Sequence, residues 1–303
     1  MEKILITGGT GMIGAHLSAL LAAQGYEVRH LSRKRNLSAK FPAYAWDYTT
    51  QTIDIEAFEG VNTIIHLAGA GIVDKAWTAK YKKEIIDSRV LTTQLLYDTI
   101  KKNKLPITQF IATSAVGFYG DTQAKVTDES GTKGKGFLTE SCVEWENSVL
   151  KVKDLVARVC IIRTGVVFST KGGALPKLLL NYMVGVGTYF GDGKAFMPWI
   201  HINDHARLFA EAIQNKAWSG VYNGSAPQPL NGIDLANELG KGYGRHFFTV
   251  SVPAFALKLG LGESAETVLN SSNVVPRRAL AEGFEFEFTT VSEAVRDLLR
   301  KKI

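Results

Sequence analysis

The chain has 303 residues, enough for one large domain or two closely joined ones, and 46% of them are hydrophobic while 21% are charged. These proportions are usual for folded globular proteins and exclude disordered and fibrous classes. The net charge is +6, but lysines and arginines are interspersed with acidic residues instead of forming a basic run. We therefore expect no nucleic-acid partner.

Cysteine content and hydropathy bear on where the protein works. Cys142 and Cys160 are the two cysteines, which are too few for a disulfide framework and lack the spacing of a structural zinc site. A strand-like run follows MEK directly, without the pattern of a secretory leader. The most apolar stretch, residues 250–262, is interrupted by Pro253 and Lys258. We expect reduced thiols, a cytoplasmic location and no membrane partner.

Short β-branched segments alternate with longer helical patterns through the first half of the chain. Strand-like runs include KILIT, YEVRHLSR, TIIHLAGA and QFIATSAVGFYG, with MIGAHLSALLAAQG and VLTTQLLYDTIKKN as helical patterns between them. The run VARVCIIRTGVVF, residues 156–168, indicates one further buried strand. This alternation predicts an α/β fold with a Rossmann-like, doubly wound parallel sheet.

After residue 168 the pattern becomes mixed, which predicts a smaller C-terminal α/β lobe. We expect a nucleotide-binding domain over residues 1–168, completed by about residues 195–225. The smaller lobe would comprise residues 169–194 and 226–303. The segment PWIHINDHARLFAEAI indicates a strand that enters a helix with Asn203 or Asp204 as its N-cap, and TVSEAVRDLLRKK indicates a C-terminal helix.

The segment ITGGTGMIGAHL, residues 6–17, joins the first strand to the first helix and contains TGxxGxxG. Gly8 permits a tight turn, Gly11 lets backbone N–H groups approach a pyrophosphate, and Gly14 allows close packing of helix on sheet. A helix N-terminus binds anions through its free N–H groups and its dipole. The loop therefore predicts a dinucleotide site that involves Thr7, Gly8, Gly11, Met12, Ile13 and Gly14.

The end of the second strand indicates which dinucleotide is bound. Folds that select NAD commonly place an acidic residue there for the ribose hydroxyls, whereas a 2′-phosphate needs positive charge. Here the sequence is LSRKRN, with Ser32 and Arg33 where the acid would stand and Lys34 or Arg35 in support. The alternative is that these basic residues form a solvated turn. We predict NADP(H) over NAD(H), because a guanidinium makes forked contacts to phosphate.

His201 and His205 have the i, i+4 spacing that can place two imidazoles on one helix face. The glutamate base and third ligand of an HExxH zinc site are not apparent around them. We expect no metal.

Several motifs together resemble a known superfamily. TGxxGxxG, HLAG at 66–69 and ATSAVGFYG at 112–120 resemble the extended short-chain dehydrogenases/reductases, which include sugar-nucleotide epimerases and dehydratases. Further blocks resemble its atypical branch of epimerase family proteins, some of them labelled division inhibitors; these blocks are residues 77–93, 140–146, 163–169, 198–206 and 274–288. The resemblance implies a Rossmann-type fold, a nicotinamide dinucleotide cofactor, and contacts to it from Leu67, Ala68, Gly69 and Thr113.

The resemblance also draws attention to a missing catalytic pair. Ordinary relatives use a tyrosine and a lysine four residues later on one helix, where the lysine lowers the pKa of the tyrosine. The corresponding segment here, residues 136–149, has neither residue type, and Leu138 and Cys142 take the two places. The usual acid–base machinery of epimerases is therefore absent from this chain.

Other side chains could serve the site. We expect Ser114 and Tyr119 near the nicotinamide as tentative proton donors, or bonded to their own loop. Arg89 and Arg163 could hold an anionic substrate such as a sugar nucleotide, or pair with carboxylates between the lobes. The resemblance places Trp199 and His201 on the substrate side, although core packing suits the tryptophan equally.

Two functional hypotheses follow. The first is an NADP(H)-dependent oxidoreductase or sugar-nucleotide epimerase-like enzyme that acts on a small molecule, which the hydroxyl and imidazole groups favour. The second is a non-catalytic, NADPH-responsive regulator or scaffold, which the missing pair favours. Either form could be a homo-oligomer.

Overall fold

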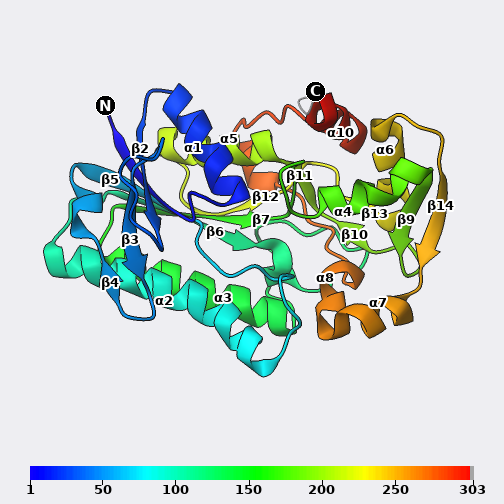
Figure 1. Cartoon of the computed structure of the whole chain (residues 1–303), viewed down its shortest axis with the longest axis horizontal. Coiled ribbons are helices and arrows are strands. Elements are labelled where there is room, and N and C mark those ends of the chain that lie inside the picture. Colours follow the sequence, from blue (N-terminus) through cyan, green and yellow to red (C-terminus); the bar gives the residue numbers. More distant parts are fainter. Residues whose placement is uncertain (301–303) are drawn as a thin grey trace.

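The computed structural model describes residues 1–300. Its centre is an eight-stranded sheet in the order β12-β7-β6-β5-β1-β2-β3-β4 (Figure 1). The strands in chain order are Lys3–Thr7 (β1), Glu27–Ser32 (β2), Ala43–Asp47 (β3), Thr52–Ile53 (β4), Val61–His66 (β5), Gln109–Ala115 (β6), Arg158–Thr164 (β7) and Gly220–Gly224 (β12).

The pairing in this sheet is parallel except at one edge, where β4 runs antiparallel to β3. Strand β1 lies between β2 and β5, so that Ile4 faces Val28 on one side and Thr63 on the other. Chain order therefore reverses at β1, and the loops that leave β1, β5 and β6 meet at one edge of the sheet. This topological switch point is where α/β sheets bind ligands.

Helices cover both faces of the sheet, which confirms the doubly wound α/β class (Figure 1). One face carries α2 (Ala79–Asn103) and α3 (Phe137–Leu150), and the other carries α1 (Met12–Ala23) and α5 (Ile202–Gln214). A hydrophobic core lies on each face of the sheet, and successive side chains of β1 point to opposite faces. Ile4 and Ile6 therefore pack on the α1 side, while Leu5 packs on the α2 side.

The predicted strand over 156–168 is two strands. Strand β7 ends at Thr164 and β8 (Val166–Phe168) leaves the sheet to pair with β11 (Trp199–His201). Gly165 makes the turn possible, because a Cβ at this residue would overlap the carbonyl oxygen of Pro198. The strands β3 and β4 were not predicted, so the strand that precedes HLAG is the fifth in the chain.

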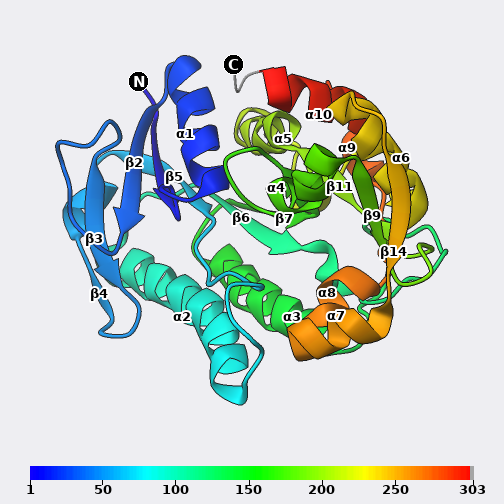
Figure 2. The same ribbon diagram turned by 45° about the vertical axis from the view of Figure 1, so that its right-hand side comes forward.

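The remaining elements form a second group beside the sheet (Figure 2). Its short strands pair as β9 with β14, in parallel, and β10 with β13, antiparallel. Helix α6 packs against both β9 and α10. The bounds are Leu175–Leu179 (α4), Val186–Phe190 (β9), Phe196–Met197 (β10), Leu230–Asn231 (β13), Gly232–Tyr243 (α6), Phe248–Val252 (β14), Ala254–Leu261 (α7), Glu266–Leu269 (α8), Arg277–Ala281 (α9) and Val291–Arg300 (α10).

Short 3-10 turns lengthen or connect several of these elements. One of them, η2 (Val116–Tyr119), follows β6 directly and carries the chain away from the sheet edge. The others are Ile55–Phe58 (η1), Lys151–Asp154 (η3), Leu180–Val184 (η4) and Gly262–Ala265 (η5). In the described part of the chain, no helix combines the length and apolar character that crossing a lipid bilayer requires. The predicted helix TVSEAVRDLLRKK is present as α10, but Lys301 and Lys302 lie outside the described residues.

The start of α5 corrects the predicted N-cap. The cap is His201, whose Nδ1 accepts a hydrogen bond from the Asn203 N–H at 3.0 Å. Asp204 is fully buried and has a different role, because its two carboxylate oxygens accept from the N–H groups of Glu287 at 3.0 Å and Phe288 at 2.9 Å. Arg207 donates to the same carboxylate at 2.8 Å. Asp204 therefore ties the segment that precedes α10 to the main domain.

Replacing Asp204 with alanine should lower the free energy of unfolding by about 3 kcal/mol, because it leaves buried N–H groups without an acceptor. Urea denaturation followed by circular dichroism measures this change. Asp192→Ala, in an exposed loop, is the matched control and should change stability by no more than about 0.5 kcal/mol. Equal stability of the two variants would show that Asp204 does not hold the C-terminal segment.

Candidate nucleotide-binding site

The glycine loop between β1 and α1 is built by close backbone approach. Gly8 has φ +68°, and the N–H of Gly11 donates to the Gly8 carbonyl at 3.0 Å. A Cβ on Gly14 would overlap that same carbonyl, so the first turn of α1 rests directly on the loop. Gly11 is the N-cap of α1 and no side chain caps the helix. The first N–H groups of α1 are thus suited to a bound anion.

Thr7 is fully buried and fastens the glycine loop to the loop after β5. Its hydroxyl oxygen accepts from the N–H groups of Leu67 at 3.0 Å and Ala68 at 3.1 Å. The hydroxyl proton is then left for Nδ1 of His66, 2.8 Å away. Thr7 was predicted from the glycine loop as a cofactor-site residue. Its side chain faces the protein interior and acts on the backbone of the two loops.

His66 completes the same hydrogen-bond chain as a neutral imidazole. Because Nδ1 accepts from Thr7, the ring proton sits on Nε2, which lies 3.1 Å from the Thr93 hydroxyl, and that hydroxyl donates to the Arg89 carbonyl at 2.7 Å. Burial lowers the pKa of His66 to about 3, and the nearby charge of Arg89 acts in the same direction. A neutral histidine therefore links β1, β5 and α2 beneath the loop.

A second neutral histidine supports the loop from the β2 side. The ring of His30 occupies the space where a Gly9 side chain would be. Ser18 donates to the Gly14 carbonyl at 2.7 Å, so its oxygen accepts from Nε2 of His30 at 2.8 Å. Burial lowers the pKa of His30 to about 4.

The basic residues after β2 divide into two groups. Ser32 donates to the Lys34 carbonyl at 2.5 Å, which closes a tight turn. Arg35 forms ion pairs with Asp54 and Glu56. It was predicted as a possible support for Arg33 at a phosphate, and these pairs leave it unavailable for that role. Arg33 and Lys34 are exposed, and within residues 1–300 their side chains form no hydrogen bond or ion pair. Arg33 and Lys34 are therefore both free to meet a ligand at the end of β2.

The other predicted cofactor residues lie along the same sheet edge. The carbonyl oxygen of Leu67 would be only 3.1 Å from a Cβ on Gly8. Gly69 lies against the side chain of Arg89, whose Cζ would be 3.1 Å from a Cβ on that glycine. The Thr113 hydroxyl lies 2.9 Å from that of Thr164.

The sequence did not predict a contact that the glycine loop's helix makes with the loop after β8. Residues Gly172 and Gly173, in the loop after β8, approach the side chain of Met12, since a Cβ on Gly173 would lie 3.4 Å from its Cε. The consecutive glycines in TKGGA were the available signal, because such a pair lets backbone come close to a partner.

Ser114 and Tyr119 belong to a buried polar network. Neither predicted alternative, a proton donor beside the nicotinamide or a hydroxyl bonded to its own loop, describes their hydrogen bonds to Glu146 and Asn223. Ser114 donates to Oε1 of Glu146 at 2.7 Å. Arg163 makes a forked ion pair with both carboxylate oxygens of Glu146 at 2.8 Å, and its third donor reaches the Tyr119 hydroxyl at 2.9 Å. Tyr119 in turn donates to Asn223 at 2.8 Å, and burial raises its pKa. The hydroxyls of Ser114 and Tyr119 are therefore both engaged within this network.

The predicted substrate residues are also internal. Arg163 is paired as above, and the guanidinium of Arg89 lies 4.8 Å from the ring centre of Trp145 and donates to the Ile85 carbonyl at 2.8 Å. Trp199 stacks on Phe168 with ring centres 5.6 Å apart, and His201 stacks on Phe288 at 3.8 Å. Trp199 and His201 are each only 1% exposed. Arg163 thus forms the carboxylate pair that was its predicted alternative, and Trp199 packs in the core, as its alternative had it. His201 is buried against Phe288 and does not line the pocket at the carboxyl ends of β6 and β7.

His205 is fully buried and lies 2.9 Å from the Thr164 hydroxyl through Nε2. His201 instead lies near Asp297, at 3.3 Å. Among residues 1–300, no three His, Cys, Asp or Glu side chains gather in a way that could hold a metal ion.

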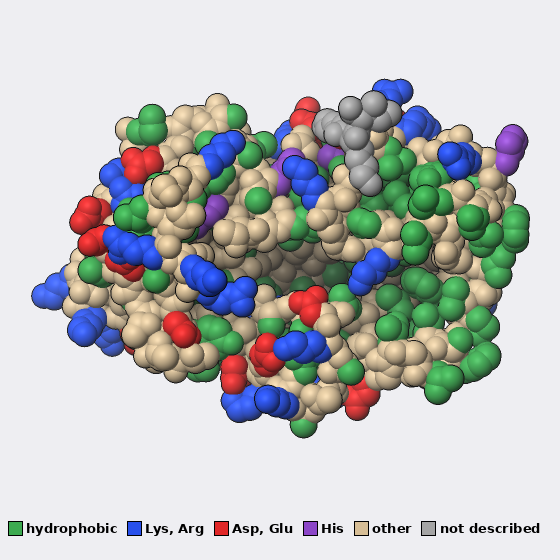
Figure 3. All heavy atoms as spheres, viewed as in Figure 1, with side chains coloured by type: hydrophobic (Ala, Val, Ile, Leu, Met, Phe, Trp, Pro, Cys, Tyr) green, Lys and Arg blue, Asp and Glu red, His purple; other side chains and the backbone are tan. Residues whose placement is uncertain are grey.

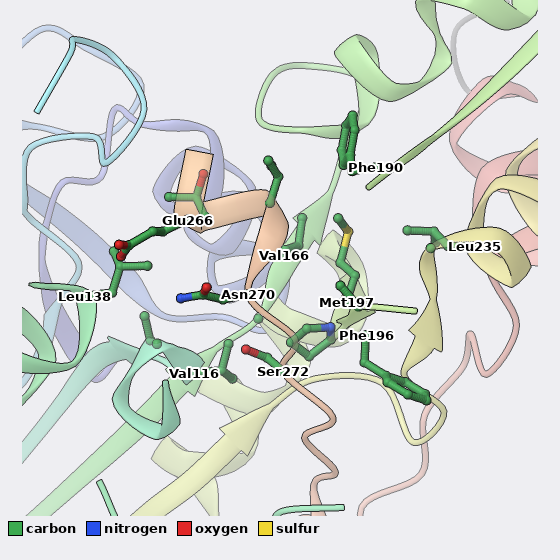
Figure 4. A pocket seen from close by; sticks show the side chains of 18 of the residues that line it. Val116, Leu138, Val166, Phe190, Phe196, Met197, Leu235, Glu266, Asn270 and Ser272 are labelled. Atoms are coloured by element: carbon green, nitrogen blue, oxygen red, sulfur yellow. The ribbon is translucent and has the colours of Figure 1, made fainter. Parts of the chain in front are cut away.

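A pocket of about 410 Å³ opens at the carboxyl ends of β6 and β7, on the same sheet edge as the glycine loop. The hollow is visible between the two halves of the molecule in Figure 3. Its wall includes Val116 and Gly117 of η2 and Leu138 of α3 (Figure 4). Leu138, in the place of the missing tyrosine, thus faces the cavity. Cys142 lies behind it, and burial raises its pKa to about 12, so this thiol does not replace the lysine.

Sheet order, glycine loop and adjacent pocket define a NAD(P)-binding Rossmann protein. The chain belongs to the NAD dependent epimerase/dehydratase family, whose model matches residues 4–223, while residues 252–298 match a domain of unknown function, DUF1731. This confirms the resemblance to an atypical short-chain dehydrogenase/reductase.

Individual relatives agree with this family assignment. The chain is similar to the epimerase family protein SDR39U1 homolog, chloroplastic, of Arabidopsis thaliana, with 35% identity over 98% of this chain and 86% of the relative. The crystal structure of human epimerase family protein SDR39U1 (isoform 2) with NADPH has a TM-score of 0.86, with 30% identity over 98% and 99% of the two chains. A nucleoside-diphosphate sugar epimerase from Corynebacterium glutamicum has a TM-score of 0.79 and 30% identity, covering 98% of this chain and 58% of its own.

The buried histidines should make the protein acid-sensitive. Burial lowers the pKa values of His30, His66 and His205 to about 4, 3 and 3. Their neutral forms stabilise the fold fully above pH ~6.5, where unfolded histidine is also neutral, and this stability is lost as the pH falls toward the folded values. In urea titrations, the stability advantage of the natural protein over His66→Gln should shrink by about 1 kcal/mol per pH unit below pH ~6.

The exposed His246 supplies the control for this experiment. His246→Gln should parallel the natural protein at every pH. A constant difference between the natural protein and His66→Gln would mean that His66 titrates normally in the folded state.

Proposed function

We propose that the protein binds NADP(H) in preference to NAD(H) and uses it for hydride transfer with a small molecule in the adjacent pocket. The observation that carries the cofactor preference is the unpaired Arg33 at the end of β2, with Ser32 in the place of an acidic residue. A ribose 2′-phosphate at this edge would meet a guanidinium, and no carboxylate would take the 2′-hydroxyl of NAD. The human relative solved with NADPH supports the same preference.

The described residues fit such a cofactor from end to end. The N–H groups at the start of α1 would hold the pyrophosphate, and Arg33 with Lys34 would hold the adenosine phosphate. The backbone of Leu67, Ala68 and Gly69 borders the ribose side of the loop, because it packs on Gly8 and is fixed by Thr7. The nicotinamide end would then reach the pocket at the carboxyl ends of β6 and β7.

The chemistry that the pocket can support is limited by what lines it. A bound NADPH would supply a hydride to a carbonyl carbon, and bulk water would supply the proton that completes the alcohol, with the hydroxide taken up by the buffer. Leu138 offers no acid or base, and Ser114 and Tyr119 are committed to Glu146 and Asn223. Sugar epimerisation begins by removing a hydroxyl proton, for which these residues provide no base. Reduction of an already electrophilic carbonyl needs less acid–base assistance from the protein than epimerisation does.

The same lack of a proton donor supports the second candidate, an NADPH-responsive regulator without turnover. The two are separated by following NADPH absorbance with pooled aldehydes and ketones and with sugar nucleotides. Consumption of NADPH that depends on the added compound supports the enzyme. Tight NADPH binding without consumption by any pool supports the regulator.

Arg33→Glu should weaken NADPH binding by about tenfold to a hundredfold, because it replaces a charge-assisted contact with repulsion. NADH binding should change by no more than about twofold, since NADH has no phosphate there. Isothermal calorimetry with both nucleotides measures the two affinities.

Lys216→Glu has the same change of charge at the opposite edge of the sheet, in the exposed loop before β12, and should leave both affinities unchanged. Parallel losses for NADPH and NADH in Arg33→Glu would show that Arg33 does not recognise the phosphate.

A further inference from the structure

The wall of the pocket is mainly hydrocarbon from elements far apart in the sequence. Aliphatic and aromatic side chains converge from η2, α3, β8, β9, β10 and α6, and Figure 4 shows them around one cavity; they include Val116, Leu138, Val166, Phe190, Met197 and Leu235. The volume of about 410 Å³ is within the range of small-molecule sites. Such a wall favours a ligand that is itself mostly apolar, because the gain comes from removing apolar surface from water.

The charged side chains that line this cavity do not offer the net positive charge that a diphosphate needs. Lys135 and Glu266 are the two charged residues that line it, and both are exposed. Their charges are opposite, and Glu266 lies beside the backbone that follows Lys135, with its Oε2 3.8 Å from where a Cβ on Gly136 would be. Arg163, the guanidinium behind the pocket wall, is already paired with Glu146. A nucleotide sugar would therefore bring two negative charges to a surface with no net positive charge, which is costly.

The carboxamide of Asn270 is a polar group inside the cavity that is available to a ligand. Asn270 lines the pocket, and Figure 4 shows its carboxamide between Leu138 and Ser272. The Asn270 side chain makes no hydrogen bond with another residue in 1–300, whereas the Ser272 hydroxyl already donates to the Gly120 carbonyl at 3.4 Å. A carboxamide N–H can donate to a carbonyl oxygen without adding charge.

We infer that this pocket selects an uncharged, mainly apolar carbonyl compound, with the carboxamide of Asn270 as hydrogen-bond donor to its oxygen, and does not take a sugar nucleotide. The inference rests on the proposed function, because it names the substrate class for the hydride-transfer site. It differs from what the names of the epimerase relatives would imply. The reason is that the pocket wall of this chain is mainly hydrocarbon and its two lining charges are opposite.

A matched pair of probes tests the inference on the full chain loaded with NADPH. Benzylacetone is an uncharged apolar ketone, and hydrocinnamate has nearly the same shape with a carboxylate in place of the methyl ketone. Calorimetry should detect benzylacetone, with hydrocinnamate at least about tenfold weaker because its charge has no buried partner. UDP-glucose should be weaker still. No binding of benzylacetone, or binding of hydrocinnamate or UDP-glucose at least as tightly, overturns the inference.

Two variants identify the groups responsible. Asn270→Asp keeps the size but removes the N–H donor, and should weaken benzylacetone binding about tenfold; Asn147→Asp, on the exposed side of α3, is its control. Leu138→Lys adds a cation to the wall and should reverse the preference toward hydrocinnamate; Leu180→Lys, at a side chain that is 63% exposed, is its control. An unchanged ranking of the probes in Asn270→Asp and Leu138→Lys would contradict the assigned roles.

NADPH affinity and melting temperature, measured first on each protein, separate the possible failures. If the natural protein does not bind NADPH, the proposed function fails. If it binds NADPH but prefers UDP-glucose to benzylacetone, the substrate class alone is wrong. If Leu138→Lys loses NADPH affinity through misfolding, the isosteric Asn270→Asp still tests the contact.

Discussion

The close approach of backbone at the start of α1 is the constraint on which the rest of the site depends. Gly14 rests on the Gly8 carbonyl, where any side chain would collide, and this contact sets the direction of α1 against the sheet. Thr7 and His66 then fasten the glycine loop to the loop after β5. Because both loops are held, the start of α1, the turn with Arg33 and the pocket lie along one sheet edge. The two neutral histidines achieve this without placing charge beneath an anionic ligand.

A buried ion pair gives α3 a structural role in place of the acid–base role expected for this helix. Glu146 and Arg163 join α3 to β7, and the hydroxyls of Ser114 and Tyr119 satisfy the remaining donors and acceptors. Breaking such a pair leaves a charge without a partner in a low-dielectric region, so its members are held together. The groups that looked most reactive are therefore those with the least freedom to react. The pocket-facing side of α3 presents Leu138 to the cavity in their place.

The position and the composition of the pocket carry different information. Its position, beside the switch point of the sheet, follows from the family fold. Its composition does not: the wall contains hydrocarbon where binding of a diphosphate would require cations, and the opposite charges of Lys135 and Glu266 at the mouth offset each other. Similarity of fold to epimerases therefore supports a common cofactor, while the ligand must be argued from the residues of this wall.

The sequence by itself determined the α/β class, the glycine loop, the basic turn after β2 and the missing tyrosine–lysine pair, because each depends on a few residues close together in the chain. Tertiary structure decided which polar residues remain available. Arg33 and Arg35 are two positions apart, yet Arg35 is held by Asp54 and Glu56. Likewise, Glu146 accepts hydrogen bonds from Ser114 and Arg163, and Asn223 accepts one from Tyr119. Such partners are tens of residues apart in sequence and meet only when sheet order brings them together, so local spacing could not reveal whether a side chain faces a ligand or a neighbour.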